Sequence, residues 1–169
     1  MQPATSFDWG REIMPTPHGN NPVPNATETK FGDPDTRIAQ TACWTVLLRP
    51  KQPTLGSLVL VCREPVRQFS AVSPAAFADL AQVVKGVERM LGQVVGYERI
   101  NYLMLMMVDP DVHFHVIPRY ASARQHAGVQ YADAGWPGPP QLEPAVVPEP
   151  QARAALLEML RSAWATAAA

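Results

Sequence analysis

The stretch that most constrains this chain is Asp111–Arg119, which reads DVHFHVIPR and alternates polar with apolar residues. Successive side chains of a β-strand point to opposite faces, so Asp111, His113 and His115 should share one face at intervals of about 6.6 to 6.8 Å. The opposite face would carry Val112, Phe114 and Val116. We expect the apolar face to be buried. The histidine face is then either available for chemistry or simply turned to water.

Two apolar runs predict a second pair of strands. Residues 43–49 (CWTVLLR) and 58–62 (LVLVC) are rich in β-formers and flank the connection PKQPTLGS. This pattern predicts two antiparallel strands joined by a loop. Arg49, at the end of the first strand, is interpreted either as an anion contact or as an edge residue that reaches solvent.

A helix is expected to begin at Ser73-Pro74, because serine caps free amide groups and proline is favoured at the first helical position. Apolar residues then recur at three- and four-residue spacing to about Val95, and Gly96 favours an end there. Residues 100–107 (INYLMLMM) are almost wholly apolar and stop at Asp109-Pro110. They predict a strand buried on both faces.

The order strand, strand, helix, strand, strand predicts the α+β class, with a mostly antiparallel sheet of about five strands and a packed helix in a single domain. Proline-rich, irregular tails flank it. We divide the chain into an N-terminal extension (1–35), a folded domain (36–125) and a linker with a C-terminal helix from about residue 151 (126–169). His18 and His126 lie in the irregular stretches and are expected to be solvated.

The charge composition bears on which binding partners the chain could have. The formal net charge is −1, with 14 Lys and Arg against 15 Asp and Glu, so no overall charge favours nucleic acid or an anionic membrane. No secretory signal or membrane-spanning run is apparent, and we expect a cytoplasmic protein. Cys43 and Cys62 sit in apolar runs and are interpreted as buried, reduced thiols, which excludes an all-sulfur zinc site.

Two imidazoles on one face suit attack on an electrophile that carries negative oxygens. A neutral imidazole is a competent nucleophile, and a second one can hold an oxygen or the leaving group. Phosphoryl centres fit this description. Arg49 or Arg119 could supply further anion contacts, since catalysis of phosphoryl transfer rests largely on positioning and charge stabilisation.

The stretch from about Trp44 to Tyr120 resembles the histidine triad (HIT) superfamily of nucleotide hydrolases and transferases. The run His113-Phe114-His115-Val116-Ile117-Pro118-Arg119 is similar to the form found in the fragile-histidine-triad branch of diadenosine polyphosphate hydrolases. The upstream run LGSLVLV (55–61) and the helix between the two hairpins support the likeness. The resemblance implies that residues 36–125 form a HIT-like catalytic domain.

The resemblance also implies roles for individual residues. His113 would be the nucleophile that forms a covalent nucleotidyl-imidazole, and His115 would hydrogen-bond the phosphate or bridging oxygen. Asp111 replaces the first histidine of the triad, whose main-chain carbonyl orients the nucleophile. Its carbonyl survives the replacement, although its carboxylate could instead favour a protonated His113. The implied nucleotide-binding residues are Arg49, Ser57, Leu47, Val59 and Arg119.

The family pattern is not complete, because Arg49 replaces the usual Asn, Ser57 a frequent His and Leu105 the usual Gln. Cleavage of dinucleoside polyphosphates, such as diadenosine tetraphosphate, or of nucleoside phosphoramidates is the function implied. No obligatory cofactor is expected, although Mg²⁺ could accompany a polyphosphate, and a homodimer is implied by the family alone. Two alternatives stay open: a nucleotide-binding module without catalysis, and a mononuclear metal site on Asp111, His113 and His115.

Overall fold

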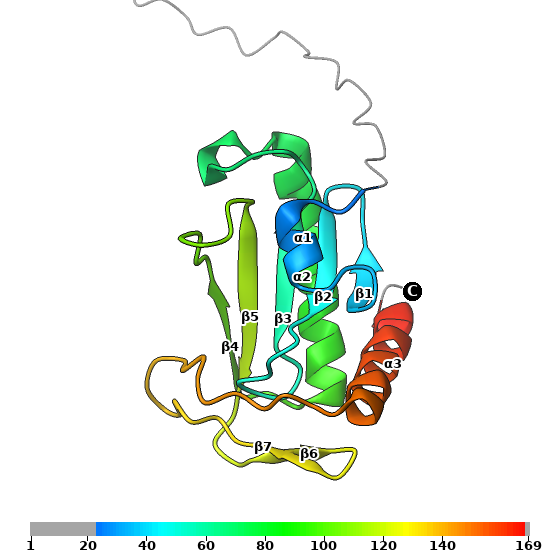
Figure 1. The fold of residues 1–169 in the computed structure, drawn as a ribbon, viewed down its shortest axis with the longest axis vertical. Helices are drawn as coiled ribbons and strands as arrows, with labels where there is room; N and C mark the ends of the chain where they lie inside the picture. The colour runs from blue at the N-terminus through cyan, green and yellow to red at the C-terminus, as the bar shows by residue number, and fades with distance from the viewer. Residues whose placement is uncertain (1–22, 168–169) are drawn as a thin grey trace, which may run out of the picture.

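The computed structural model describes residues 23–167, so most of the N-terminal extension, including His18, lies outside the described residues. One antiparallel sheet of five strands, in the order β1-β2-β3-β5-β4, forms the centre of the fold (Figure 1). With its helices it makes the single α+β domain that the sequence predicts. The strands are β1 (Arg37–Gln40), β2 (Trp44–Leu48), β3 (Leu58–Cys62), β4 (Arg99–Leu103) and β5 (His113–Arg119).

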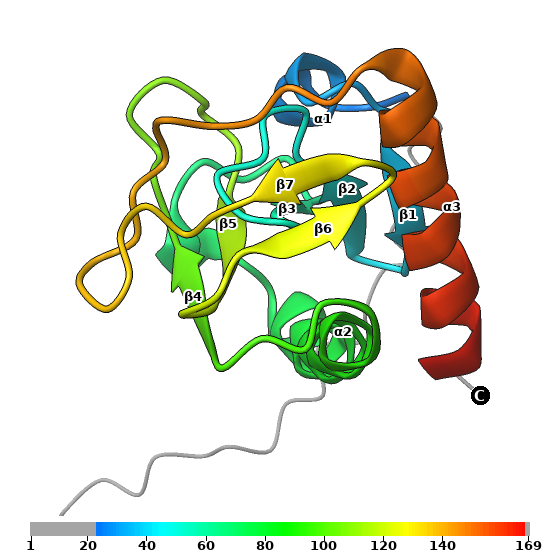
Figure 2. The same ribbon diagram turned by 90° about the horizontal axis from the view of Figure 1, so that it is seen from below.

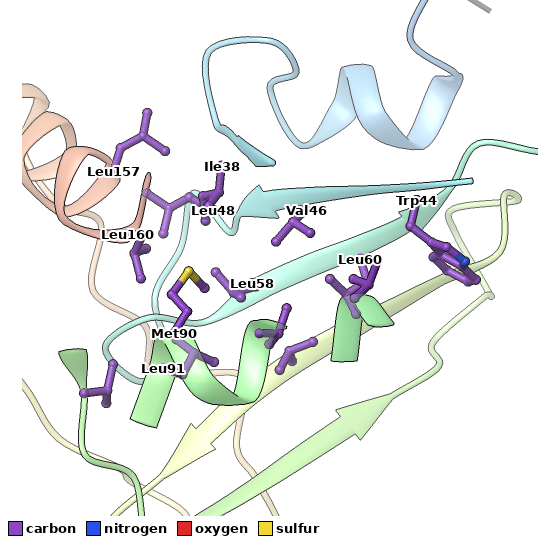
Figure 3. Packing of buried hydrophobic residues seen from close by; sticks show 14 of the residues in the cluster. Ile38, Trp44, Val46, Leu48, Leu58, Leu60, Met90, Leu91, Leu157 and Leu160 are labelled. Carbon is purple, nitrogen blue, oxygen red and sulfur yellow. The ribbon is translucent and has the colours of Figure 1, made fainter. Parts of the chain in front are cut away.

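Helix α2 (Pro74–Val94) covers one face of this sheet, as predicted. Its N-terminus is capped by Ser73, whose side chain accepts a hydrogen bond from the Ala76 amide, and it ends before Gly96, which has a φ of +60°. The apolar stripe of α2 packs against the side chains that β2 and β3 direct to this face (Figure 3). Residues at the centre of this core include Trp44, Val46, Leu48, Leu58, Leu60, Met90 and Leu91.

Helix α3 (Pro150–Ala167), predicted from about residue 151, lies beside α2 and edge strand β1 (Figures 1 and 2). It buries Leu156 and Leu160 in the same core. Its Trp164 ring lies so close to Gly86 of α2 that a Cβ at Gly86 would be 2.8 Å from the ring. The two helices therefore meet where α2 has no side chain.

The prediction of a fully buried strand over residues 100–107 is wrong. β4 ends at Leu103 and forms an edge of the sheet, so its residues are only partly buried. The chain then leaves the sheet, and Leu105, Met107 and Val108 are 44%, 95% and 80% exposed. Apolar composition alone does not reveal whether a strand has neighbours on both sides, which is why the sequence misled here.

Two further elements were not predicted. Strand β1 pairs with β2, and the stretch after Tyr120 forms a small hairpin, β6 (Arg124–His126) and β7 (Val129–Tyr131). Its turn is Ala127-Gly128, with φ angles of +49° and +77°. His126 is therefore on a strand and half-buried rather than solvated in an irregular linker. Residues 134–149 are largely irregular, as their prolines indicate.

Cys43 and Cys62 are free thiols buried in the core, which confirms their predicted state. Burial raises the pKa of the Cys62 thiol to about 11, so this group remains protonated at neutral pH. Within residues 23–167, no helix combines the length and apolar character that crossing a membrane requires.

Candidate functional site

The two histidines of β5 lie side by side on the face of the sheet opposite α2. β5 pairs with β3 so that His113 faces Val61 and His115 faces Val59, and residues that face each other across a ladder share one face. The two imidazole centroids are 5.2 Å apart and their planes meet at 84°. Phe114 points the other way and packs against Trp44. The predicted alternation of this strand is confirmed, but the expectation that the histidine face is open is wrong, because His113 and His115 are both buried.

The ring of His113 is held by the backbone two residues before it. Its Nδ1 lies 2.8 Å from the main-chain oxygen of Asp111. A carbonyl oxygen only accepts hydrogen bonds, so Nδ1 carries a proton, and in the neutral form of the ring Nε2 carries the lone pair. That Nε2 is buried and has no hydrogen-bond partner among the described residues. The arrangement leaves a nucleophilic nitrogen without a competing donor.

His115 is only 6% exposed, and its Nδ1 also has no partner in the described part of the chain. The pKa of His115 is lowered to about 4, chiefly by burial; the electrostatic effects of His113, Arg49 and Lys30 act in the same direction and that of Asp109 opposes them. His115 is therefore neutral at pH 7. A neutral imidazole donates one N–H hydrogen bond, which suits contact with an anionic oxygen.

The carboxylate of Asp111 accepts hydrogen bonds from Thr27 and not from these imidazoles. It is 8% exposed, and its Oδ2 accepts hydrogen bonds from the Thr27 amide at 3.1 Å and the Thr27 hydroxyl at 2.9 Å. The three side chains of the hypothetical metal site thus do not converge. Residues 23–167 contain no group of three or more His, Cys, Asp or Glu side chains that could hold a metal ion.

Thr27 belongs to a helix that the sequence analysis missed, since residues 1–35 were expected to be irregular. Helix α1 (Ala26–Lys30) begins with a capping box in which the Asn25 side chain accepts from the Glu28 amide and Glu28 accepts from the Asn25 amide. α1 lies on the opposite side of the sheet from α2 (Figure 2). The Asn-x-x-Glu pattern was the available signal, but five residues are too few to show an apolar period.

Phe31, directly after α1, covers the histidine face. Its ring centroid lies 6.2 Å from that of His113 and 5.6 Å from that of His115. It also packs on a small apolar cluster of Leu47, Val59 and Val61, which is separate from the main core. Leu47 and Val59, predicted to lie near a nucleoside, are therefore on the same face as the imidazoles and are fully buried there.

Arg49 remains a candidate anion contact. Its Nε is buried without a partner among the described residues, while one terminal nitrogen donates to the Lys51 carbonyl. Burial lowers the pKa of the guanidinium, whose charge is close enough to His115 to act on that imidazole. A buried guanidinium N–H without an acceptor is costly unless a ligand supplies one.

Ser57 and Arg119, the other predicted nucleotide contacts, are engaged elsewhere. The Ser57 hydroxyl donates to the Thr54 carbonyl at 2.8 Å within the β2–β3 connection. Arg119 is 4% exposed and donates to Asp133, Asn101 and the Gly138 carbonyl at 2.5, 2.9 and 3.0 Å. Its guanidinium therefore ties the irregular segment after β7 to the sheet. We do not retain either residue as a nucleotide contact.

An open cavity of about 410 Å³ lies at the C-terminal end of α1. Lys30 and Arg153 bring positive charge to its wall, and Leu48 and Leu157 bring apolar surface. Lys30 also forms an ion pair with Asp109, and its charge acts on His115.

Comparison with known proteins agrees with the fold. The HIT domain family model matches residues 33–122, more than half of the chain. The structure is similar to that of a histidine triad protein from Bradyrhizobium japonicum, with a TM-score of 0.66, 19% identity, and coverage of 83% of this chain and 96% of that one.

Two further solved structures are similar. One is a histidine triad protein from Sinorhizobium meliloti, with a TM-score of 0.65 and 20% identity over 83% of this chain and 95% of that one. The other, a hypothetical histidine triad nucleotide-binding protein from Sulfolobus tokodaii, has a TM-score of 0.58 and 17% identity over 78% and 84% of the two chains. No curated protein matches the sequence significantly.

Proposed function

The chain belongs to the HIT domain family, and from this premise we propose that it is a nucleotide hydrolase or transferase that cleaves nucleoside 5'-phosphate derivatives. Dinucleoside polyphosphates, such as diadenosine tetraphosphate, and nucleoside phosphoramidates are the substrate classes. The name of the Sulfolobus tokodaii neighbour, a nucleotide-binding protein, agrees with this choice.

One observation carries the proposal: the hydrogen bond from Nδ1 of His113 to the Asp111 carbonyl, which in the neutral ring places the lone pair on Nε2, an atom without a hydrogen-bond partner among the described residues. In the proposed reaction, the Nε2 lone pair attacks the phosphorus bonded to the nucleoside 5' oxygen. The N–P bond forms as the bond from phosphorus to the leaving oxygen or nitrogen breaks, and the leaving group takes that electron pair.

Water, or another acceptor, then attacks the same phosphorus. The N–P bond breaks, its electron pair returns to Nε2, and the proton of the water goes to the medium. The products are a nucleoside monophosphate and the original neutral imidazole, so no external oxidant or reductant is needed.

The neighbouring groups favour an anionic substrate. Neutral His115 and the unpartnered Nε of Arg49 are N–H donors close to the reacting nitrogen, and both would gain an acceptor when a phosphate binds. The apolar cluster beneath Phe31 would contact the nucleoside.

The test is hydrolysis of a panel of dinucleoside polyphosphates and nucleoside phosphoramidates by the full chain and by His113→Ala. We expect release of nucleoside monophosphate to fall at least about a thousandfold in this variant. His126→Ala removes a histidine from β6, outside the proposed site, and should retain wild-type rates. Wild-type turnover by His113→Ala would contradict the proposal.

A binding module without catalysis is the second candidate, and the complete burial of His113 beneath Phe31 favours it. Calorimetric titration with the same nucleotides separates the two functions. Nucleotide binding by the wild-type chain with no turnover across the panel would favour the binding module.

We also propose a homodimer. β4 is an edge strand, and the apolar residues that follow it, Leu105, Met107 and Val108, are exposed among the described residues. Such an edge favours pairing with another chain. Light scattering coupled to size-exclusion chromatography should give twice the mass of one chain, and a monomer at micromolar concentration would contradict this proposal.

A further inference from the structure

We propose that Asp111 is a positioning residue whose carboxylate holds α1 over His113 and His115. The segment 26–31, which contains α1 and Phe31, is then part of the active site. The inference rests on the proposed function in one respect, namely that these imidazoles are the reacting pair. The contact itself, between residues 84 positions apart in the chain, depends only on the fold.

A helix of five residues has little stability by itself in water. Its first amides need acceptors, and α1 has two kinds: the Asn25 side chain accepts from Glu28, and the Asp111 carboxylate accepts from the Thr27 amide and hydroxyl. A negative charge at this end also interacts favourably with the helix dipole. Asp111 therefore supplies, from the connection between β4 and β5, a second cap beside the local capping box of Asn25 and Glu28.

The connection between β4 and β5 contacts both ends of α1. Asp111 contacts Thr27 near the N-terminus of the helix, and Asp109 forms an ion pair with Lys30 at its last residue. Thr45 of β2 donates to Glu28 at 2.5 Å from below. Together these contacts fix the point at which Phe31 leaves the helix and crosses the imidazoles.

Asp111 thus acts through two separate atoms. Its main-chain oxygen fixes the proton on Nδ1 of His113, and its Oδ2 fixes α1. Truncation of the side chain removes the second contact and keeps the first. The two roles can therefore be separated by substitution.

The pKa of His115 depends on whether α1 covers this imidazole. The groups that act electrostatically on this imidazole are His113, Arg49, Lys30 and Asp109, and burial is the largest influence on its pKa. Release of α1 would admit water and withdraw Lys30 from Asp109. Each of these changes raises the pKa of His115 toward its ordinary value.

The test is an NMR titration of the imidazoles in the full chain, comparing Asp111→Ala, Asp111→Asn and Thr27→Val with the wild type. The matched control is Asp79→Ala. Asp79, on α2, also accepts from one threonine hydroxyl and one backbone amide, those of Thr41 and Cys43, at 2.7 and 2.8 Å. It therefore makes the same kind of contact without touching α1.

We expect the midpoint of His115 to rise by about one pH unit or more in Asp111→Ala and by less in Thr27→Val, which keeps the amide donor. Asp111→Asn retains an acceptor oxygen and should stay near the wild type, as should Asp79→Ala. The nitrogen chemical shifts of His113 should still report a proton on Nδ1 in Asp111→Ala.

An unchanged midpoint in a folded Asp111→Ala protein, or an equal rise in Asp79→Ala, would overturn the inference. If Asp111→Ala does not fold, Thr27→Val decides the matter by the same criterion. The titration needs no substrate, so its outcome is independent of turnover. If the wild-type chain hydrolyses none of the nucleotides, the proposed function is contradicted, but the role of Asp111 in holding α1 is not.

Discussion

Nδ1 of His113 lies 2.8 Å from the main-chain oxygen of Asp111. The orientation of the proposed nucleophile therefore depends on a backbone atom, which every residue at position 111 would provide. The side chain at this position is free to serve another purpose, and its carboxylate bonds to Thr27 instead. An aspartate in place of the first triad histidine is thus compatible with an intact nucleophile.

The depressed pKa of His115 predicts a pH-dependent stability. At pH 7 the imidazole is neutral in both the folded and the unfolded chain. As the pH falls below about 6.5, the unfolded chain takes up a proton that the folded chain does not accept until about pH 4. As the pH falls across this interval, His115 should therefore lower the free energy of unfolding by about 3 kcal/mol.

Urea denaturation of the wild type and of His115→Asn between pH 4.5 and 7 measures this contribution. The stability of the variant should fall less steeply toward low pH than that of the wild type. Equal slopes in the wild type and His115→Asn would show that the pKa of His115 is not depressed.

Arg119 should be essential for stability. Its side chain and that of Asp133 are 4% and 2% exposed, so Arg119→Met would leave a buried carboxylate without its partner. We expect a loss of about 3 to 5 kcal/mol in the free energy of unfolding.

The exposed ion pair of Lys51 with Glu143 provides the comparison, because its side chains are 59% and 61% exposed. Lys51→Met should cost no more than about 1 kcal/mol. Similar losses in the two variants, measured by urea denaturation, would contradict the scaffold role of Arg119.

The packing of α3 on α2 predicts opposite effects for two glycines of one helix. A Cβ at Gly86 would lie 2.8 Å from the Trp164 ring, whereas one at Gly92 would meet nothing within 4 Å. Gly86→Ala should therefore lower the free energy of unfolding by about 1 to 3 kcal/mol. Gly92→Ala should raise it by about 0.5 to 1 kcal/mol. Thermal denaturation that ranks Gly86→Ala as the more stable variant would refute this packing.

Long periodic elements could be predicted from the sequence. The alternation along β5 placed both imidazoles on one face, and the apolar stripe of α2 placed that helix on the sheet. The five-residue strands β2 and β3 were predicted from their richness in β-formers, but the similarly short β1, α1, β6 and β7 were not. They show no period, and tertiary contacts such as that of Asp111 with Thr27 hold them in place.

The candidate site was predicted less completely than the fold. Arg119 follows the histidines closely in sequence, but it lies about 13 Å beyond His115 along an extended strand, where its donors are already used. Phe31, by contrast, is more than 80 positions before His113 in the sequence and contacts both rings. Sequence proximity suggested the first assignment, and only the folded chain reveals the second.

The central claim is that Nε2 of His113 forms a bond to the nucleotide. Rapid mixing of the full chain with a dinucleoside polyphosphate radiolabelled at the α-phosphorus, followed by quenching and peptide mapping, tests it most directly. We predict label on the peptide that contains His113 and its loss in His113→Ala. Turnover by the wild type without label on His113 at any mixing time would contradict the claim.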